Sequence, residues 1–153
     1  MEYINFLLEI GERAYKAAYN RGKKTNVPAC IEAAHRELGE YWEAHDLDKK
    51  CTKHDQRVAK CLAENTEFIK FYEKNIHNTD LDELADLCIV AATWCYASYL
   101  VSVQREEQWD PMRDLDAVMC SGFVAFALGA IDDAEVFANA INNKMRYNEL
   151  RKD

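Results

Sequence analysis

The sequence is poor in residues that break helices. Its 153 residues include only five glycines and two prolines, and a β-sandwich or barrel needs turn residues at much shorter intervals. The abundant Ala, Leu, Glu and Lys favour helix instead. Internal repeats and low-complexity segments are absent as well. We therefore expect an all-α fold in a single domain over residues 1–153, which is long enough for one core.

Several functional signals are also missing. The chain has no Walker A loop and no glycine-rich dinucleotide fingerprint. None of the six cysteines forms a C-x-x-C pair, and Cys88, Cys95 and Cys120 lie in apolar runs. This indicates reduced core thiols and not a disulfide framework. The first residues lack the basic start of a signal peptide, so we expect a cytoplasmic protein.

The net charge of −8 sets limits on the partners. A surface this acidic repels the backbone of DNA and RNA, so a nucleic-acid partner is not expected. A small polyphosphate is still compatible with it, because bound cations and local Lys or Arg residues can neutralise such a ligand.

Two long uncharged runs, Leu87–Val103 and Ala117–Ile131, raise the question of a membrane. Both are shorter than the roughly 20 residues that span a bilayer. They also contain Thr93, Ser98 and several cysteines. We therefore interpret them as buried core helices, with no membrane partner.

Apolar spacing and capping residues predict six helices. Pro28 suits a first helical turn, and Thr79 or Asp80 suits an N-cap followed by acidic residues. Asp132 or Asp133 caps the last helix. The expected helices cover residues 2–20, 28–46, about 56–76, 80–103, 115–130, and 133 nearly to the C-terminus.

Two pairs of acids are spaced by one helical turn. Glu37 and Glu40 share one face of their helix, and Glu83 and Asp86 share a face of theirs. The second pair begins a stripe that continues as predicted core, with Val90, Trp94, Ala97 and Val101. Buried carboxylates are costly unless they are neutralised, and two pairs brought together would raise each other's pKa values. A hard divalent cation would resolve this conflict.

The first pair is less certain in register, because Glu40 and Glu43 have the same spacing. Glu37 and Glu40 lie on a stripe flanked by Ala33 and Ala44, which leaves room for a ligand, and we prefer them for that reason. The same helix has an apolar stripe that we expect in the core: Ile31, Ala34, Leu38, Trp42 and His45. A simpler interpretation also stands, in which these acids are solvated and the second pair only favours the helix dipole.

The last helix carries a stripe that turns from apolar to polar, formed by Phe137, Ile141, Lys144, Asn148 and Arg151. Two cations and an amide on such a face suit an anionic ligand. Cations near a helix C-terminus are also common without any ligand.

Three motifs in this order resemble the MazG-like nucleotide pyrophosphohydrolases, a family of the all-α NTP pyrophosphatases that also include dimeric dUTPases and phosphoribosyl-ATP pyrophosphohydrolases. The motifs are Arg36-Glu-Leu-Gly-Glu-Tyr-Trp-Glu-Ala44, Glu83-Leu-Ala-Asp86 and Lys144-Met-Arg-Tyr-Asn148-Glu-Leu-Arg151. They match the family pattern of E-x-x-E, E-x-x-D and a late K-x-x-x-N-x-x-R. The resemblance covers roughly residues 20–46 and 80–151.

The resemblance implies a four-helix-bundle-like core with one or two additional helices. It implies that Glu37, Glu40, Glu83 and Asp86 hold Mg²⁺, or Mn²⁺ in its place, and form the catalytic site. Lys144, Asn148 and Arg151 would contact the substrate. The implied reaction is hydrolysis of an NTP or dNTP to the monophosphate and pyrophosphate, for nucleotide-pool house-cleaning, in a homo-oligomer (dimer or tetramer).

The chain departs from the family pattern in two places. The segment between Glu40 and Glu83 is longer than in compact members, and Arg36 stands where many relatives have another Glu. The latter leaves the number of metal ions open. The tryptophans could stack on a base, but Trp42 and Trp94 fit the core better by their spacing.

Other functions remain open at this stage. A di-iron carboxylate bundle would use Glu32 with His35, but a second E-x-x-H is missing. A zinc site would use His45, Cys51, His54 and Cys61 at irregular spacing. A helical interaction module without activity would keep the fold alone. Gly122 and Gly129 share an apolar face that permits close helix contact within or between subunits.

Overall fold

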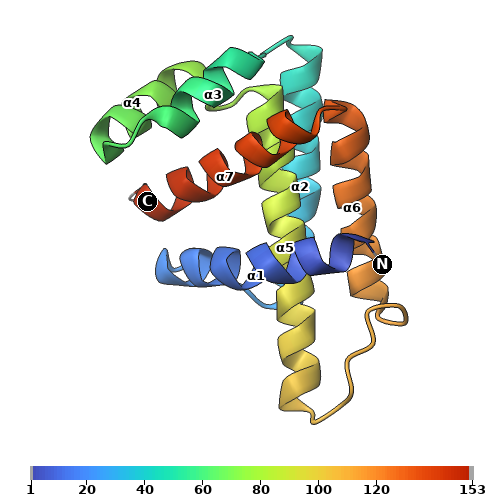
Figure 1. Ribbon diagram of the computed structural model, residues 1–153. Coiled ribbons are helices and arrows are strands. Elements are labelled where there is room, and N and C mark those ends of the chain that lie inside the picture. Colours follow the sequence, from blue (N-terminus) through green and yellow to red (C-terminus); the bar gives the residue numbers. More distant parts are fainter. Residues whose placement is uncertain (1, 152–153) are drawn as a thin grey trace.

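The computed structural model describes residues 2–151, with side chains from residue 3, and contains no strand in that range (Figure 1). This confirms the all-helical fold class. In chain order the helices are α1 (Glu2–Asn20), α2 (Val27–Asp46), α3 (Lys53–Cys61), α4 (Asn65–Asn75), α5 (Asp80–Gln104), α6 (Leu115–Ile131) and α7 (Ala134–Leu150).

Helix α5 is the central element, and α1, α2, α6 and α7 all pack against it (Figure 1). Its position follows from its composition, because it is apolar on nearly every side. The predicted cap at its start is confirmed, since the Thr79 side chain accepts a hydrogen bond from the Asp82 N–H. Trp94 is fully buried in the main core, as expected.

Helix α1 crosses α5 at a glycine. A Cβ atom on Gly11 would lie 2.6 Å from the carbonyl oxygen of Ala92. Only a residue without a side chain permits the two backbones to approach this closely. The crossing holds α1 across the face of α5 that also receives α7.

The single helix expected over residues 56–76 is wrong, because this segment forms two helices, α3 and α4. Thr52 and Asp55 build a capping box at the start of α3, and Leu62 ends it in an extended conformation. The Glu64 side chain then caps α4 by accepting from the N–H groups of Thr66 and Glu67. The Glu64 cap satisfies a helix start that a continuous helix would not possess.

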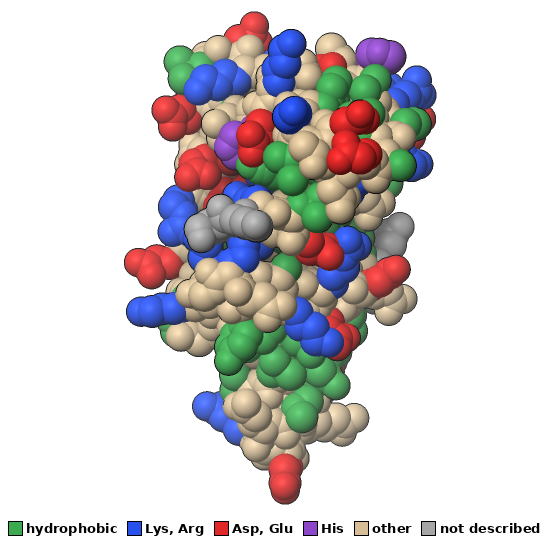
Figure 2. Space-filling model, turned by 90° about the vertical axis from the view of Figure 1, so that its left-hand side faces the viewer, with side chains coloured by type: hydrophobic (Ala, Val, Ile, Leu, Met, Phe, Trp, Pro, Cys, Tyr) green, Lys and Arg blue, Asp and Glu red, His purple; other side chains and the backbone are tan. Residues whose placement is uncertain are grey.

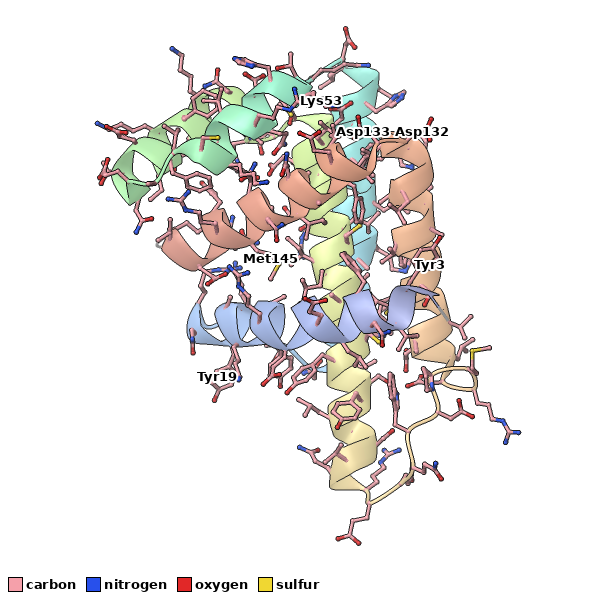
Figure 3. All side chains as sticks on the ribbon, in the orientation of Figure 1. Tyr3, Tyr19, Lys53, Asp132, Asp133 and Met145 are labelled. Atoms are coloured by element: carbon pink, nitrogen blue, oxygen red, sulfur yellow. The ribbon has the colours of Figure 1, made fainter. Side chains whose placement is uncertain are left out.

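We call α3 and α4 together the arm. Its apolar residues form a second, smaller core with Tyr147 of α7, composed of Ala59, Phe68, Tyr72 and Ile76. Polar contacts add to it: the Asn143 amide donates to the carbonyl and the side chain of Gln56, and Lys53 pairs with Asp133 at 2.9 Å (Figure 3). Helix α7 is thus held between α5 and the arm.

The core stripe expected on α2 is displaced around the helix. Trp42 is 46% exposed and His45 is also exposed, so both expectations were wrong. The buried positions of α2 are Cys30, Ala34, Tyr41 and Ala44. Trp42 instead lies against Phe126 on α6, with ring centroids 6.1 Å apart and the ring planes tilted by 54°. Glu37 therefore faces α5, because Glu37 lies between Ala34 and Tyr41 on the buried stripe of α2.

The two uncharged runs differ in their surroundings. Helix α5 is long and apolar enough to cross a membrane, and 67% of its apolar window is buried within the protein. Helix α6 buries one face and leaves Val118, Met119 and Phe126 exposed. Among the cysteines, which are all free, Cys30, Cys88, Cys95 and Cys120 are buried.

Candidate metal centre and adjoining cavity

Three carboxylates from two helices meet beside the start of α5. Glu83 and Asp86 lie in its first two turns, and Glu37 approaches from α2. Each offers an oxygen, and these three oxygens lie within 4.8 Å of one another. In the part of the chain that the structure describes, this is the one group of His, Cys, Asp or Glu side chains with such spacing.

Glu40 lies at the edge of this group. Its side chain is exposed, and it hydrogen-bonds to the Glu37 carboxyl, whose pKa it helps to raise. Its charge also acts on Glu83. The structure therefore brings three of the four predicted acids together and leaves Glu40 one turn further out. Glu43 is exposed and outside the group.

The electrostatics of the three acids are unfavourable without a cation. Burial and the charge of Asp86 raise the pKa of Glu37 to about 9, and the same two causes raise the pKa of Glu83 to about 8. Burial also raises the pKa of Asp86, against the opposing charge of Lys144. Carboxylates shift in this way when they face each other with too little positive charge nearby.

The hydrogen bonding leads to the same conclusion. Glu83 is only 6% exposed, and its Oε2 atom has no hydrogen-bond partner; the Oε2 atom of Glu37 also lacks one. A buried polar oxygen without a partner is costly and rare. The residues present thus fit a hard divalent cation, which prefers carboxylate oxygens. The set contains no His or Cys, unlike the iron and zinc sites considered from the sequence.

Asp82, which the sequence analysis did not select, is the best-satisfied carboxylate of the region. It is 1% exposed and accepts hydrogen bonds from the Tyr72 hydroxyl and, at 2.9 Å, from the Asn78 N–H. Lys144 Nζ lies 3.0 Å away, and His77 Nδ1 lies 3.5 Å away. Burial alone would raise the pKa of Asp82, but these neighbours outweigh it and lower the pKa to about 2.

Lys144 lies behind the acids and not at the surface. It is 1% exposed, and its Nζ contacts Asp82 Oδ1 at 3.0 Å and Asp86 Oδ2 at 3.3 Å. Although burial would lower its pKa, these two carboxylates raise it. In this geometry the ammonium holds Asp86 in place and neutralises it.

A cavity of about 320 Å³ opens from the acidic group. Glu37 and Asp86 line it, together with residues of α1, the 21–25 segment, α2, α5 and α7. Asn148 and Arg151, predicted from the last stripe, both belong to its lining. So do six basic residues: Arg13, Arg21, Lys23, Lys24, Arg36 and Arg151. Figure 2 shows the face of the molecule on which the C-terminal ends of α1 and α7 lie. Lys and Arg side chains are visible near mid-height on this face.

Helix α1 and the 21–25 segment, for which the sequence motifs predict no role, form one side of the cavity. A signal was available, because Arg21, Lys23 and Lys24 form the densest basic run in an acidic chain. Asp82 also had one, because it precedes Asp86 by four residues and therefore lies on the same face of α5 as Asp86.

Comparison with protein-family models, curated proteins and solved structures finds no match for this chain.

Proposed function

We propose that this protein is a metal-dependent nucleoside triphosphate pyrophosphohydrolase of the all-α type. The observation that carries the proposal is the convergence of Glu37, Glu83 and Asp86 beside a cavity with basic residues in its lining. Carboxylates for a metal and cations for phosphates in one place are what hydrolysis of a polyphosphate requires.

Glu37, Glu83 and Asp86 would hold Mg²⁺ or Mn²⁺, with Glu40 at the edge of the site. When bound, such an ion neutralises charge on phosphoryl oxygens and lowers the pKa of a water molecule. Because the Oε2 atoms of Glu37 and Glu83 lack other partners, these two residues supply the oxygens best placed for it.

The substrate would be an NTP or dNTP, cleaved between the α- and β-phosphates to give the monophosphate and pyrophosphate. Arg36, next to Glu37 on α2, and Arg151 at the end of α7 line the cavity and suit phosphate oxygens. Lys144 would act by positioning Asp86, since its ammonium is already engaged with two carboxylates.

The arrangement of helices supports the same proposal. Helices α2 and α5 supply the acids, and α7 supplies Lys144, Asn148 and Arg151, in the order the resemblance implies. We propose that the helices around α5 correspond to a four-helix-bundle-like core and that the arm is an addition, which braces α7 from outside.

The proposed partner at the exposed face of α6 is a second copy of the chain. Helix α6 carries no charged residue from Ala117 to Ile131, in a chain of net charge −8. Copies of an acidic protein repel each other least where neither carries charge, and Phe126 with Trp42 adds exposed apolar area there. Light scattering after size exclusion tests this: a dimer or tetramer is expected, and Phe126→Glu should shift it toward monomer.

The experiment that tests the activity is an assay of pyrophosphate release from each NTP and dNTP, with Mg²⁺, Mn²⁺ or chelator. We expect release from at least one nucleotide, dependent on the metal, and loss of it in Asp86→Asn. Glu43→Gln, an exposed acid on the same helix as Glu37, serves as the matched control and should retain activity. Absence of release from every nucleotide at high protein concentration would overturn the proposal.

A further inference from the structure

The cavity beside the metal centre extends into a gap between α1 and α2, where it is larger than binding of the phosphates requires. Helices α1 and α2 both pack on α5, but within residues 2–151 they do not pack on each other. The cavity occupies this gap, with α7 closing one side. Met145 of α7, which lines it, lies between α7 and α1 in Figure 3.

Five alanines line the two long walls of the gap, beside the charged side chains of Arg13, Glu32, Arg36 and Glu37. Helix α1 contributes Ala14, Ala17 and Ala18, and α2 contributes Ala29 and Ala33. Ile89 and Val90 of α5 line it as well. Methyl groups on opposed helices leave a slot with apolar sides, and such a slot suits the faces of a planar ring. A linear polyphosphate gains nothing from these surfaces.

One polar atom in the lining lacks a partner inside the protein. Asn148 is 7% exposed, and its Oδ1 atom is buried without a hydrogen bond. Asn148 is one helical turn from Lys144, which contacts Asp86, so the amide lies near the acidic group. A buried acceptor of this kind calls for a donor on the ligand, such as a sugar hydroxyl or an exocyclic amine.

The cavity lining also includes cations not engaged in ion pairs. Within the described residues, neither Lys24 nor Arg36 forms a salt bridge, although both line the cavity and are exposed. Arg13, by contrast, is paired with Glu149. Exposed cations next to an apolar slot suit a ligand with a ring at one end and phosphate at the other.

We infer that the gap between α1 and α2 is the nucleoside subsite: the base lies between the alanine faces, and a donor of the nucleoside binds Asn148 Oδ1. The inference rests on the proposed function, because it assigns the part of the substrate that the metal centre does not bind. It makes the substrate class a ring-bearing nucleotide and excludes tripolyphosphate as an equivalent substrate.

The test fills the slot from either wall. Ala33→Leu and Ala17→Leu each place a larger side chain in the cavity, and Ala138→Leu at an exposed position of α7, outside the cavity lining, is the matched control. Isothermal titration calorimetry of the whole chain, in the presence of Mg²⁺, measures the affinity for each of a panel of nucleoside 5′-monophosphates and for tripolyphosphate. We expect at least a tenfold loss of monophosphate affinity in both slot variants, and less than a twofold change for tripolyphosphate or in the control.

Two results would overturn the inference: monophosphate affinity unchanged in the slot variants, or an equal loss for tripolyphosphate, which would mean that phosphates, and not the base, lie between the alanine faces. A second measurement needs no variant, since the unaltered protein must bind at least one monophosphate more tightly than inorganic phosphate. Equal affinities overturn the inference even if the variants fail to fold.

The failure of this inference and that of the proposed function are distinguishable. If the slot variants lose nucleotide binding and the unaltered protein releases no pyrophosphate, the nucleoside subsite is supported and the proposed reaction is refuted. If both slot variants release pyrophosphate at an unchanged kcat/KM, the proposed reaction is supported and the nucleoside subsite is refuted.

Discussion

Two adjacent residues of α5, Asp82 and Glu83, show how differently buried carboxylates can be treated in one protein. Both are buried at the start of the same helix. Asp82 faces α4 and α7 and is surrounded by donors, which lower its pKa to about 2. Glu83 faces the acidic group with an unpartnered oxygen, and burial together with Asp86 raises its pKa to about 8.

Under the proposed function, this difference separates a structural carboxylate, Asp82, from a metal ligand, Glu83. Asp82 has every partner it needs inside the protein, so its contribution is to stability and to the position of Lys144. The Oε2 atom of Glu83 lacks a partner, so the ionised carboxylate is costly until a proton or a bound cation neutralises it. Burial alone would not have distinguished them; hydrogen bonding and local charge do.

Replacement of Glu83 should have the largest effect on activity. Glu83→Gln removes a metal ligand, so we expect pyrophosphate release to fall by about 100-fold or more. The same variant should melt at a higher temperature than wild type in chelator at pH 8, because the amide removes a strained buried charge. Parallel assays of activity and thermal melting check both. A variant with full activity would mean that Glu83 does not bind the metal.

Replacement of Asp82 should have the opposite pattern. Asp82→Asn leaves Lys144 with Asp86 alone, and breaking a buried pair in this way costs about 3 kcal/mol. We expect a clear loss in the free energy of unfolding by urea titration, with or without metal. A stability equal to wild type would show that the network around Asp82 contributes little. Folded Asp82→Asn protein should also bind metal more weakly, through misplacement of Asp86.

The pH dependence of stability should reverse between the two sites. Glu37 and Glu83 have raised pKa values in the folded protein, so their contribution to the free energy of unfolding is fully present below about pH 4.5. It is lost as the pH rises toward 8 and 9. Asp82 has a lowered pKa, and its contribution is lost only as the pH falls from 3.8 toward about 2. Thermal melting in chelator from pH 5 to 9 should therefore show falling stability.

Divalent metal should remove much of that fall, because it binds the ionised carboxylates. Glu83→Gln should also flatten the profile in chelator. A flat wild-type profile in chelator over this range would contradict the raised pKa values.

The smallest expected effect comes from the arm. Tyr72→Phe removes one donor from Asp82 and should cost about 1–2 kcal/mol, while the ring still packs on Tyr147. Urea titration measures it. Lys74→Gln, at an exposed position on α4, is the control. A loss as large as that of Asp82→Asn would mean that the arm, and not Lys144, determines the position of Asp82.

Much of the secondary structure could be predicted from local signals. Pro28, Thr79 and the acidic first turn of α5 identified helix starts that the structure confirms. The arm was predicted as one helix, because its break depends on the Glu64 side chain capping α4, a residue that is uncommon at that position. Trp42 was assigned to the core because an apolar spacing on α2 does not reveal which stripe faces α5.

The sequence by itself determined the helices outside the arm, and it determined the pairing of Glu83 with Asp86, because residues three apart on a helix must share a face. Tertiary structure alone decided that Glu37 joins that pair, since the packing of α2 on α5 sets which of its faces is buried. The tertiary structure also decided which groups surround the carboxylates of Asp82 and Glu83. Successive residues on a helix point about 100° apart, so one meets Lys144 and Tyr72 while the other meets two carboxylates.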